Sequence, residues 1–143
     1  MSYLNMKDEE LLTVVVELNT LLADYHIYYQ KLRSNHWNIL GENFFDLHEK
    51  FEELYGDARI KIDERILTLR YHPMSRFSDY LKVSNITEVA PLKADTDMVS
   101  ETINDHKLLL EQMSKVIKKA ESVGDEGTID LIGAYIRELE KSS

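Results

Sequence analysis

The sequence predicts an all-α protein built as a four-helix bundle, in which one long crossover joins the second helix to the third. The chain of 143 residues contains only 5 glycines and 2 prolines, and so few breaks favour long helices over strands. Apolar side chains recur at alternating steps of three and four along its helical stretches, which is the spacing of helices that face a core. Because 43% of the residues are hydrophobic, we expect one domain with one core over residues 1–143.

The first predicted helix covers residues 9–36 and carries two rows of apolar side chains. The row that faces the bundle consists of Leu11, Val14, Leu18, Leu21, Tyr25, Tyr28 and Leu32. The second row recurs every seven residues on a flanking face and consists of Val15, Leu22, Tyr29 and His36. Two rows predict packing on two sides, one within the bundle and the other against another subunit.

The second predicted helix runs from about residue 44 to residue 70. Gly41 breaks the preceding run, and Asn43 can cap the helix that follows. The core-facing row of this helix consists of Phe44, Leu47, Phe51, Leu54, Ala58 and Ile62. Pro73 ends the helix, because the residue before a proline disfavours the α conformation.

A long connection over residues 74–94 follows the second helix. Phe77, Tyr80 and Leu81 are spaced for a short extra helix that crosses the bundle within this connection. A long link between the second and third helices is what a bundle with parallel halves requires. The predicted layout is therefore ferritin-like.

Two further helices complete the predicted bundle. The third begins at Asp95 or Thr96 and ends at Val123. Its predicted inward row consists of Val99, Ile103, His106, Leu110, Met113, Ile117 and Ala120. The fourth begins near Glu126 and continues to Ser143. Its predicted inward row consists of Ile129, Ile132, Ile136 and Leu139.

The composition argues against several classes of protein. There is no cysteine, which excludes disulfides, a thiol nucleophile and thiolate metal sites, and which fits a reducing compartment. The N-terminus lacks the regions of a signal peptide, and no apolar run approaches the ~18 residues of a membrane span. We therefore expect a soluble cytoplasmic protein without a membrane partner. A net charge of −9 opposes binding to DNA phosphates and attracts cations.

Three side chains that can bind metal lie along one face of the second helix. His48 and Glu52 are four residues apart, and at ~100° per residue Asp63 lies only ~20° round from Glu52. Imidazole and carboxylate ligands without thiolate suit iron, manganese or zinc. A charged face exposed to solvent would give the same spacing, so the residues alone leave both interpretations open. His36 ends an apolar row, where a hydrogen-bonded structural histidine is the alternative to a ligand.

No Glu-x-x-His motif occurs anywhere in the chain. A di-iron site inside a single bundle takes such a motif from each of two helices. This bundle therefore cannot build that site within its own core, and any metal site must be assembled in another way.

A long series of motif residues runs through the first two helices and the crossover. The run His36-Trp37-Asn38 through Gly41 is followed by Phe44-Phe45, Leu47-His48-Glu49, Phe51-Glu52 and Leu54-Tyr55. The series continues through Ile62-Asp63-Glu64, Arg65-Ile66-Leu67 and Phe77-Ser78-Asp79-Tyr80. Together these residues resemble the signature of the Dps family, the miniferritins, over nearly the whole chain.

The resemblance implies a homo-oligomer, a dodecameric hollow shell in which the iron site lies across a two-fold interface between subunits. It implies that one subunit supplies His36, His48 and Glu52, the last standing where many members have Asp. The partner supplies an Asp, matched by Asp63, and a Glu four residues later. The implied activity is that of a ferroxidase, which oxidises Fe(II), preferably with hydrogen peroxide, at a di-iron site and stores the ferric product.

The remaining aromatic and histidine residues have less specific expectations. We expect Trp37 and Tyr55 to pack in the core, with uptake of a stray oxidising equivalent as the alternative role. His26, His72 and His106 match no position of the family motif, and we expect them to be structural or at the surface.

The chain departs from the family pattern directly after Asp63. The pattern resembles Asp-x-x-x-Glu-Arg-Ile, whereas here Glu64 follows Asp63 at once and both flanks match. Neighbours on a helix point ~100° apart, so these two carboxylates could not both face one metal. Either the protein has a deletion and a crippled site, or three residues are missing from the sequence. We favour the second alternative, because a deletion would turn the rest of the helix by ~60° and withdraw apolar residues such as Ile66 and Leu69 from the core.

The turn before the fourth helix is acidic. Asp125, Glu126 and Asp130 correspond to a region that lines a three-fold pore in the family, where carboxylates would concentrate Fe(II). For Asp125 and Glu126, stabilising a helix N-terminus is an equal alternative. Only Lys7 is basic before the first helix, so we expect no DNA binding. The alternative function is a structural or DNA-protective assembly with an impaired ferroxidase site.

Overall fold

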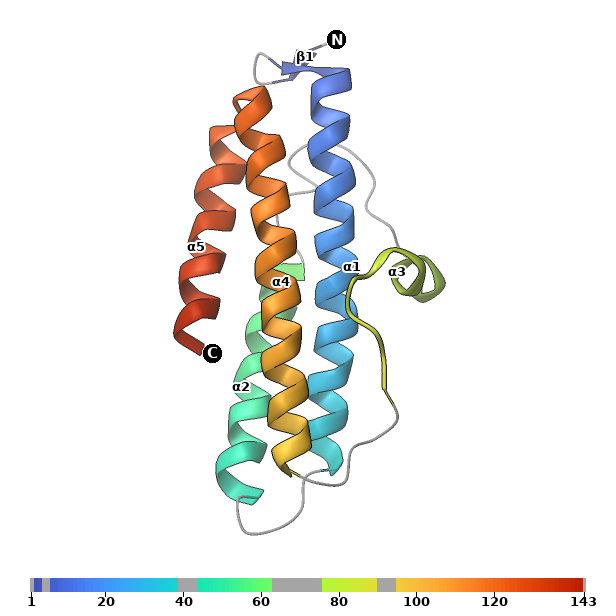
Figure 1. The fold of residues 1–143 in the computed structure, drawn as a ribbon, viewed down its shortest axis with the longest axis vertical. Helices are drawn as coiled ribbons and strands as arrows, with labels where there is room; N and C mark the ends of the chain where they lie inside the picture. The colour runs from blue at the N-terminus through green and yellow to red at the C-terminus, as the bar shows by residue number, and fades with distance from the viewer. Residues whose placement is uncertain (1, 4–5, 39–43, 63–75, 90–94, 143) are drawn as a thin grey trace.

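The computed structural model describes residues 2–3, 6–38, 44–62, 76–89 and 95–142 (Figure 1). Its helices are α1 (Asp8–Asn38), α2 (Phe44–Ile62), α3 (Phe77–Val83), α4 (Asp95–Val123) and α5 (Glu126–Ser142). A short antiparallel pair, β1 (Ser2–Tyr3) and β2 (Met6–Lys7), precedes α1. The predicted bundle of four helices with a short helix in the crossover is confirmed.

The two longest helices, α1 and α4, lie side by side (Figure 1). At one end of the molecule α2 packs against α1, and at the other end α5 packs against α4. The short helix α3 lies outside the bundle, beside the middle of α1. None of these helices, within the ranges given above, is long and apolar enough to cross a bilayer.

The first two helices bury the side chains that the sequence predicted. On α1 the bundle-facing residues are at most 4% exposed: Val14, Leu18, Leu21, Tyr25, Tyr28 and Leu32. On α2 the buried residues include Phe51, Leu54 and Ala58. Each large apolar side chain contributes roughly 1.5–3 kcal/mol by leaving water. The side chains of Leu11, Phe44 and Ile62, and the predicted extension of α2 to residue 70, lie outside the described residues.

The inward row predicted for α4 is partly wrong. Ile103 is 47% exposed, whereas Thr102 and Asp105 beside it are at most 7% exposed. The buried row of α4 consists of Met98, Thr102, Asp105, Leu109, Gln112, Met113, Val116 and Ala120, with His106. An apolar pattern could not find this row because Thr102, Asp105 and Gln112 within it are polar and are buried with hydrogen-bond partners.

The turn between α4 and α5 is built from two residues with separate tasks. Gly124 has a φ of 75°, a conformation that glycine adopts without steric cost, and it ends α4. The backbone N–H of Asp125 donates to the carbonyl of Ala120 at 2.9 Å. The carboxylate of Asp125 accepts hydrogen bonds from the backbone N–H of Thr128, at 3.3 Å, and from its hydroxyl. Asp125 is therefore the N-cap of α5.

A buried carboxylate fixes the end of α3 to α1. Asp24 accepts hydrogen bonds from the Ser84 hydroxyl at 2.9 Å and from the Asn85 backbone N–H at 2.6 Å. Burial raises the pKa of Asp24, and these hydrogen bonds oppose that increase. Nearby, the His26 ring stacks on the buried Tyr80 ring with centroids 4.0 Å apart. The crossover thus has a defined position on the α1 face.

Candidate metal centre

Two imidazoles meet where α1 packs against α2. His36 lies in the last turn of α1 and His48 near the start of α2. Their rings stack with centroids 3.6 Å apart and planes 21° from parallel, and both residues are half-buried. The helix packing that buries Leu32 and Phe51 therefore also places these two candidate ligands together.

Each of these histidines is oriented by the backbone of the other. His36 Nδ1 is 2.8 Å from the carbonyl oxygen of His48, and His48 Nδ1 is 3.0 Å from the carbonyl oxygen of His36. A carbonyl only accepts, so both Nδ1 atoms carry a proton, and Nε2 is the nitrogen that carries the lone pair in this tautomer of the neutral ring. A histidine that binds metal is oriented in this way, with its second nitrogen donating to a carbonyl or carboxylate.

Aromatic side chains pack beside the His36–His48 pair. The Tyr55 ring lies edge-on to His36 with centroids 5.4 Å apart, and Tyr29 lies edge-on to Tyr55 at 5.9 Å. The Arg33 guanidinium lies over Tyr29 at 5.2 Å and over Trp37 at 4.8 Å. Tyr55 packs against the core as expected. The same expectation is wrong for Trp37, which is 59% exposed and lies under the Arg33 guanidinium.

Carboxylates do not complete a metal site within the described part of the chain. Glu52 lies one turn after His48 and is exposed. Among the described residues, no group of three or more His, Asp or Glu side chains could hold a metal ion. Asp63 and Glu64 lie outside those residues, as do the predicted gap between them and His72. The structure thus brings His36 and His48 together and leaves Glu52 apart from them.

A second polar region joins α1 to α4 inside the bundle, and sequence reasoning missed most of it. The Lys31 ammonium is 2.7 Å from Glu101 and 2.8 Å from Asp105. One turn earlier, the Tyr28 hydroxyl is 2.7 Å from Nε2 of His106, which is buried as the structural interpretation expected. The available signal was helical spacing, because the buried polar residues of α1 share one face: Asp24, Tyr28, Lys31 and Asn35.

The burial of this second region shifts its protonation equilibria in opposite directions. Burial raises the pKa of Asp105 to about 6, although Lys31 opposes the increase. Burial lowers the pKa of His106 to about 4, with smaller contributions from the positive charges of Lys50 and Lys61. His106 is therefore a neutral imidazole at physiological pH.

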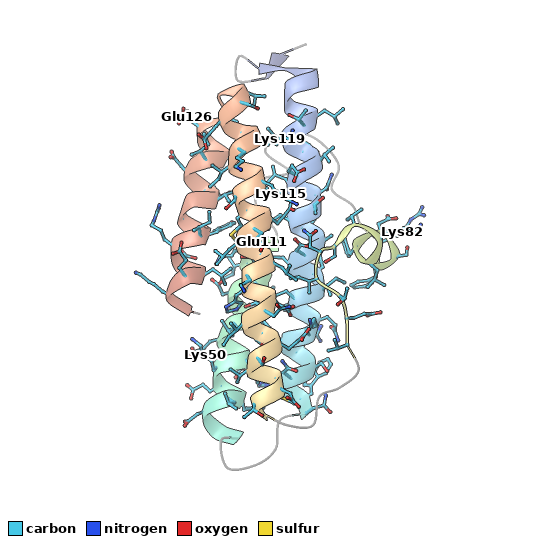
Figure 2. The ribbon with its side chains drawn as sticks, viewed as in Figure 1. Lys50, Lys82, Glu111, Lys115, Lys119 and Glu126 are labelled. Carbon is cyan, nitrogen blue, oxygen red and sulfur yellow. The ribbon has the colours of Figure 1, made fainter. Side chains whose placement is uncertain are left out.

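The pore candidates differ in their surroundings. Asp125 is 1% exposed and caps α5, so the structure supports the capping alternative for this residue. Glu126 and Asp130 are exposed on the first turns of α5, and Figure 2 shows Glu126 at the end of the molecule. Only these two carboxylates are placed to meet a cation from solution.

Comparison with known proteins gives consistent matches over this architecture. The ferritin-like domain family matches residues 15–143. DNA protection during starvation protein 2 of Bacillus anthracis is 37% identical over 131 residues, which are 90% of this chain and 90% of that protein. A Dps structure from Vibrio cholerae O1, described as a member of a broad superfamily of ferritin-like diiron-carboxylate proteins, superposes with a TM-score of 0.94. The two sequences are 40% identical, and the match covers 99% of this chain and 91% of the Vibrio cholerae chain. A Dps structure from Bacillus brevis superposes with a TM-score of 0.91 at 36% sequence identity. The match covers 96% of this chain and 94% of that chain.

Proposed function

Because this chain belongs to the Dps family of ferritin-like proteins, we propose that it is an iron-storage and detoxification protein with a ferroxidase site between subunits. It oxidises Fe(II), preferably with hydrogen peroxide, and stores the ferric product in a hollow cytoplasmic dodecamer. The observation that carries this proposal is the His36–His48 pair. Each imidazole donates from Nδ1 to a backbone carbonyl, so Nε2 is the nitrogen through which each ring would bind a metal ion.

The ligands of this pair fit iron better than softer metals. Two imidazole nitrogens and carboxylate oxygens, without any thiolate, form a donor set that suits iron. Glu52 is one turn from His48 on the same face of α2, and it is the carboxylate of this chain that we assign to the site. A shared site also needs acids from outside the chain, and Asp63 of the partner subunit is the residue we assign first. Glu64 of the partner subunit is the candidate for the second carboxylate, provided that three further residues separate it from Asp63.

An exposed apolar surface supports assembly into an oligomer. Phe77, Leu81 and Val89 are 71%, 45% and 46% exposed, and they border a cavity of about 400 Å³ against α1. Exposing apolar side chains to water is unfavourable, and a two-fold interface would bury the same surface on both subunits. On α1 this surface lies on the face of Ile27 and Ser34, about half a turn round from His36, so it supports contact between subunits without locating the metal site in that contact.

The chemistry follows from holding two ferrous ions at one site. Two Fe(II) ions supply two electrons to one hydrogen peroxide, which takes up two protons and leaves as two water molecules. Hydroxyl radical, the product of one-electron reduction, is then avoided. The chain contributes ligands, fixed geometry and enclosure, while the redox chemistry belongs to iron.

Oxidation of Fe(II) by hydrogen peroxide in the presence of the apoprotein, with oxygen excluded, tests this function. We expect peroxide to be consumed at about one equivalent per two Fe(II), much faster than oxygen is consumed at the same iron load. Light scattering should give about 200 kDa, twelve chains of 16.7 kDa. Oxidation no faster than in buffer alone would exclude the ferroxidase function, even if the shell assembles.

The alternative is a structural or DNA-protective shell, and it is favoured by the direct sequence Asp63-Glu64. Such a protein would assemble without accelerating Fe(II) oxidation. The charge distribution argues against a DNA role, because the chain carries −9 and acid and base share the outer face of α4. Glu111, Lys115 and Lys119 follow one another there at four-residue intervals (Figure 2). We therefore expect no shift of duplex DNA in a gel at physiological salt.

A further inference from the structure

A tyrosine and a histidine form a closed pair in the centre of the bundle, apart from the candidate metal centre. Tyr28 on α1 and His106 on α4 are each 2% exposed. The hydroxyl oxygen of Tyr28 lies 2.7 Å from Nε2 of His106, and the ring centroids are 5.4 Å apart. His36 is eight residues further along α1, or ~12 Å by helical rise. The pair is thus near the proposed site without belonging to it.

The protonation state of this pair is defined by its surroundings. Burial raises the pKa of the Tyr28 phenol, and the carboxylates of Asp57 and Asp105 raise it further. Because burial also lowers the pKa of His106, the imidazole is neutral at physiological pH. The phenol O–H therefore donates, and the Nε2 lone pair of His106 accepts. A short hydrogen bond connects an oxidisable phenol to a base that can receive its proton.

We propose that Tyr28 and His106 form a redox-active pair, which captures single oxidising equivalents that escape the two-electron reaction. The oxidant is hydroxyl radical, formed when hydrogen peroxide accepts one electron. Tyr28 gives up one electron, hydroxyl radical becomes hydroxide, and the phenol proton moves along the hydrogen bond to Nε2 of His106. The products are a neutral tyrosyl radical and an imidazolium. An outside one-electron donor reverses the step, and the proton returns to Tyr28.

The neighbouring Tyr25 shows why the histidine matters. Its ring lies 5.9 Å from that of Tyr28, edge-on, and the residue is 3% exposed. Its buried hydroxyl has no hydrogen-bond partner among the described residues. An oxidised phenol is a far stronger acid than a neutral one, so oxidation of Tyr25 would leave a buried positive charge with no acceptor for the proton. Of these two adjacent tyrosines, the oxidising equivalent therefore settles on Tyr28.

The charges around the pair tolerate the imidazolium. Lys61, one of the two lysines whose charges oppose the imidazolium, is neutralised by Asp57 at 2.6 Å and Glu138 at 3.0 Å. Lys50 is exposed, so water screens its charge. Asp105, the next residue to His106, adds a buried carboxylate that takes part in the Lys31 ion pair.

Aromatic contacts lead from the candidate metal centre towards the pair. Tyr55 contacts His36, Tyr29 contacts Tyr55, and Tyr29 is the sequence neighbour of Tyr28. Rings in contact thus lead as far as Tyr29, from which an oxidising equivalent passes one residue along α1 to Tyr28. The inference goes beyond the proposed function, since trapping requires neither a loaded iron site nor a shell that stores mineral.

A photochemical oxidant tests the pair without iron. The apoprotein is illuminated with a ruthenium(II) polypyridyl complex and an electron acceptor, frozen, and examined by electron paramagnetic resonance. We expect a long-lived neutral tyrosyl radical that is lost in Tyr28→Phe and kept in the matched control Tyr25→Phe. His106→Gln retains hydrogen-bonding groups but provides no base, so we expect the radical yield to fall there as well. A purely structural role for His106 would leave that yield unchanged.

Two results would overturn the inference. One is a radical of parental amplitude and spectrum in Tyr28→Phe, and the other is a parental yield in His106→Gln. Circular dichroism confirms that each variant is folded. If Tyr28→Phe does not fold, fluorotyrosine incorporated at position 28 keeps the ring and the hydroxyl, and its altered hyperfine pattern must then appear in the radical spectrum. Failure of the ferroxidase assay does not affect either outcome.

Discussion

Histidines take part in two contacts of α1, Tyr28–His106 with α4 and His36–His48 with α2, and the two contacts engage different ring nitrogens. Between α1 and α4, His106 is 2% exposed and its Nε2 accepts the Tyr28 hydroxyl at 2.7 Å. Between α1 and α2, His36 and His48 are half-buried, and backbone carbonyls bind their Nδ1 atoms at 2.8 and 3.0 Å. The first arrangement uses the imidazole lone pair inside the fold. The second holds the two imidazoles through their Nδ1 atoms, and their Nε2 atoms are the candidate metal ligands.

The difference teaches which histidines the fold completes by itself. A buried polar group needs partners within the fold, and the α1–α4 region supplies them through Tyr28, Lys31 and Asp105. The α1–α2 pair has fixed orientation without a third metal ligand among the described residues. Orientation before the ligand arrives costs less on binding than ordering afterwards. This is the property expected of half of a shared site.

The largest predicted effect concerns acid stability of the closed region. Since the folded pKa of His106 is about 4 rather than 6.5, the folded state binds fewer protons there, and stability is lost as the pH falls from 6.5 to 4. Since the folded pKa of Asp105 is about 6 rather than 3.8, the folded state binds more protons there, and stability is gained over nearly the same interval. Each contribution is ~3 kcal/mol, and the two nearly cancel.

Asp105→Asn should break this balance. The variant keeps the His106 contribution, so its stability relative to the parent should fall by ~3 kcal/mol between pH 6.5 and pH 4. Urea unfolding at several pH values and one protein concentration measures the change. His106→Gln is the matched variant, with a relative gain over the same interval. Parallel pH profiles for parent and Asp105→Asn would contradict the account.

The next effect concerns the open pair. His36→Ala removes an oriented ligand, so we expect Fe(II) oxidation by peroxide to slow by at least ~10-fold while the shell remains assembled. Lys118→Ala, an exposed change on α4, is the control. Stopped-flow absorbance at matched iron gives the rates. Equal rates for His36→Ala and the control would remove His36 from the site.

The smallest effects repeat the contrast between closed and open groups at the other end of the bundle. Asp125 is enclosed as a helix cap, so Asp125→Ala should cost ~1 kcal/mol of stability. Asp130 is exposed, so Asp130→Asn should leave stability unchanged and slow iron uptake at low salt, with less effect at high salt. Denaturation midpoints and uptake rates at two ionic strengths measure both. Unchanged uptake at low salt would remove the pore assignment of Asp130.

The sequence predicted the helices well because apolar spacing determines them, as for Leu18 and Leu32 on α1 and the capped start of α5. The prediction failed on α4, where Ile103 was expected in the core but is exposed, and where Thr102 and Asp105 are buried instead. Burial of those polar groups depends on partners from another helix, such as Lys31, which spacing within one helix cannot show. Likewise, the sequence suggested His36 and His48 as ligands, but their mutual carbonyl hydrogen bonds arise only from the packing of α1 on α2.

The central claim is that one chain supplies the histidines and another supplies Asp63. Subunits carrying His36→Ala and subunits carrying Asp63→Ala should each be slow alone. Dissociated and reassembled together at equal amounts, they should form two-fold pairs in which one site has both mutations and the other has neither. Random pairing would restore about a quarter of the sites, so peroxide-driven Fe(II) oxidation should recover to about a quarter of the parental rate. No recovery above either variant alone, in shells confirmed to contain both, would contradict a site shared between subunits.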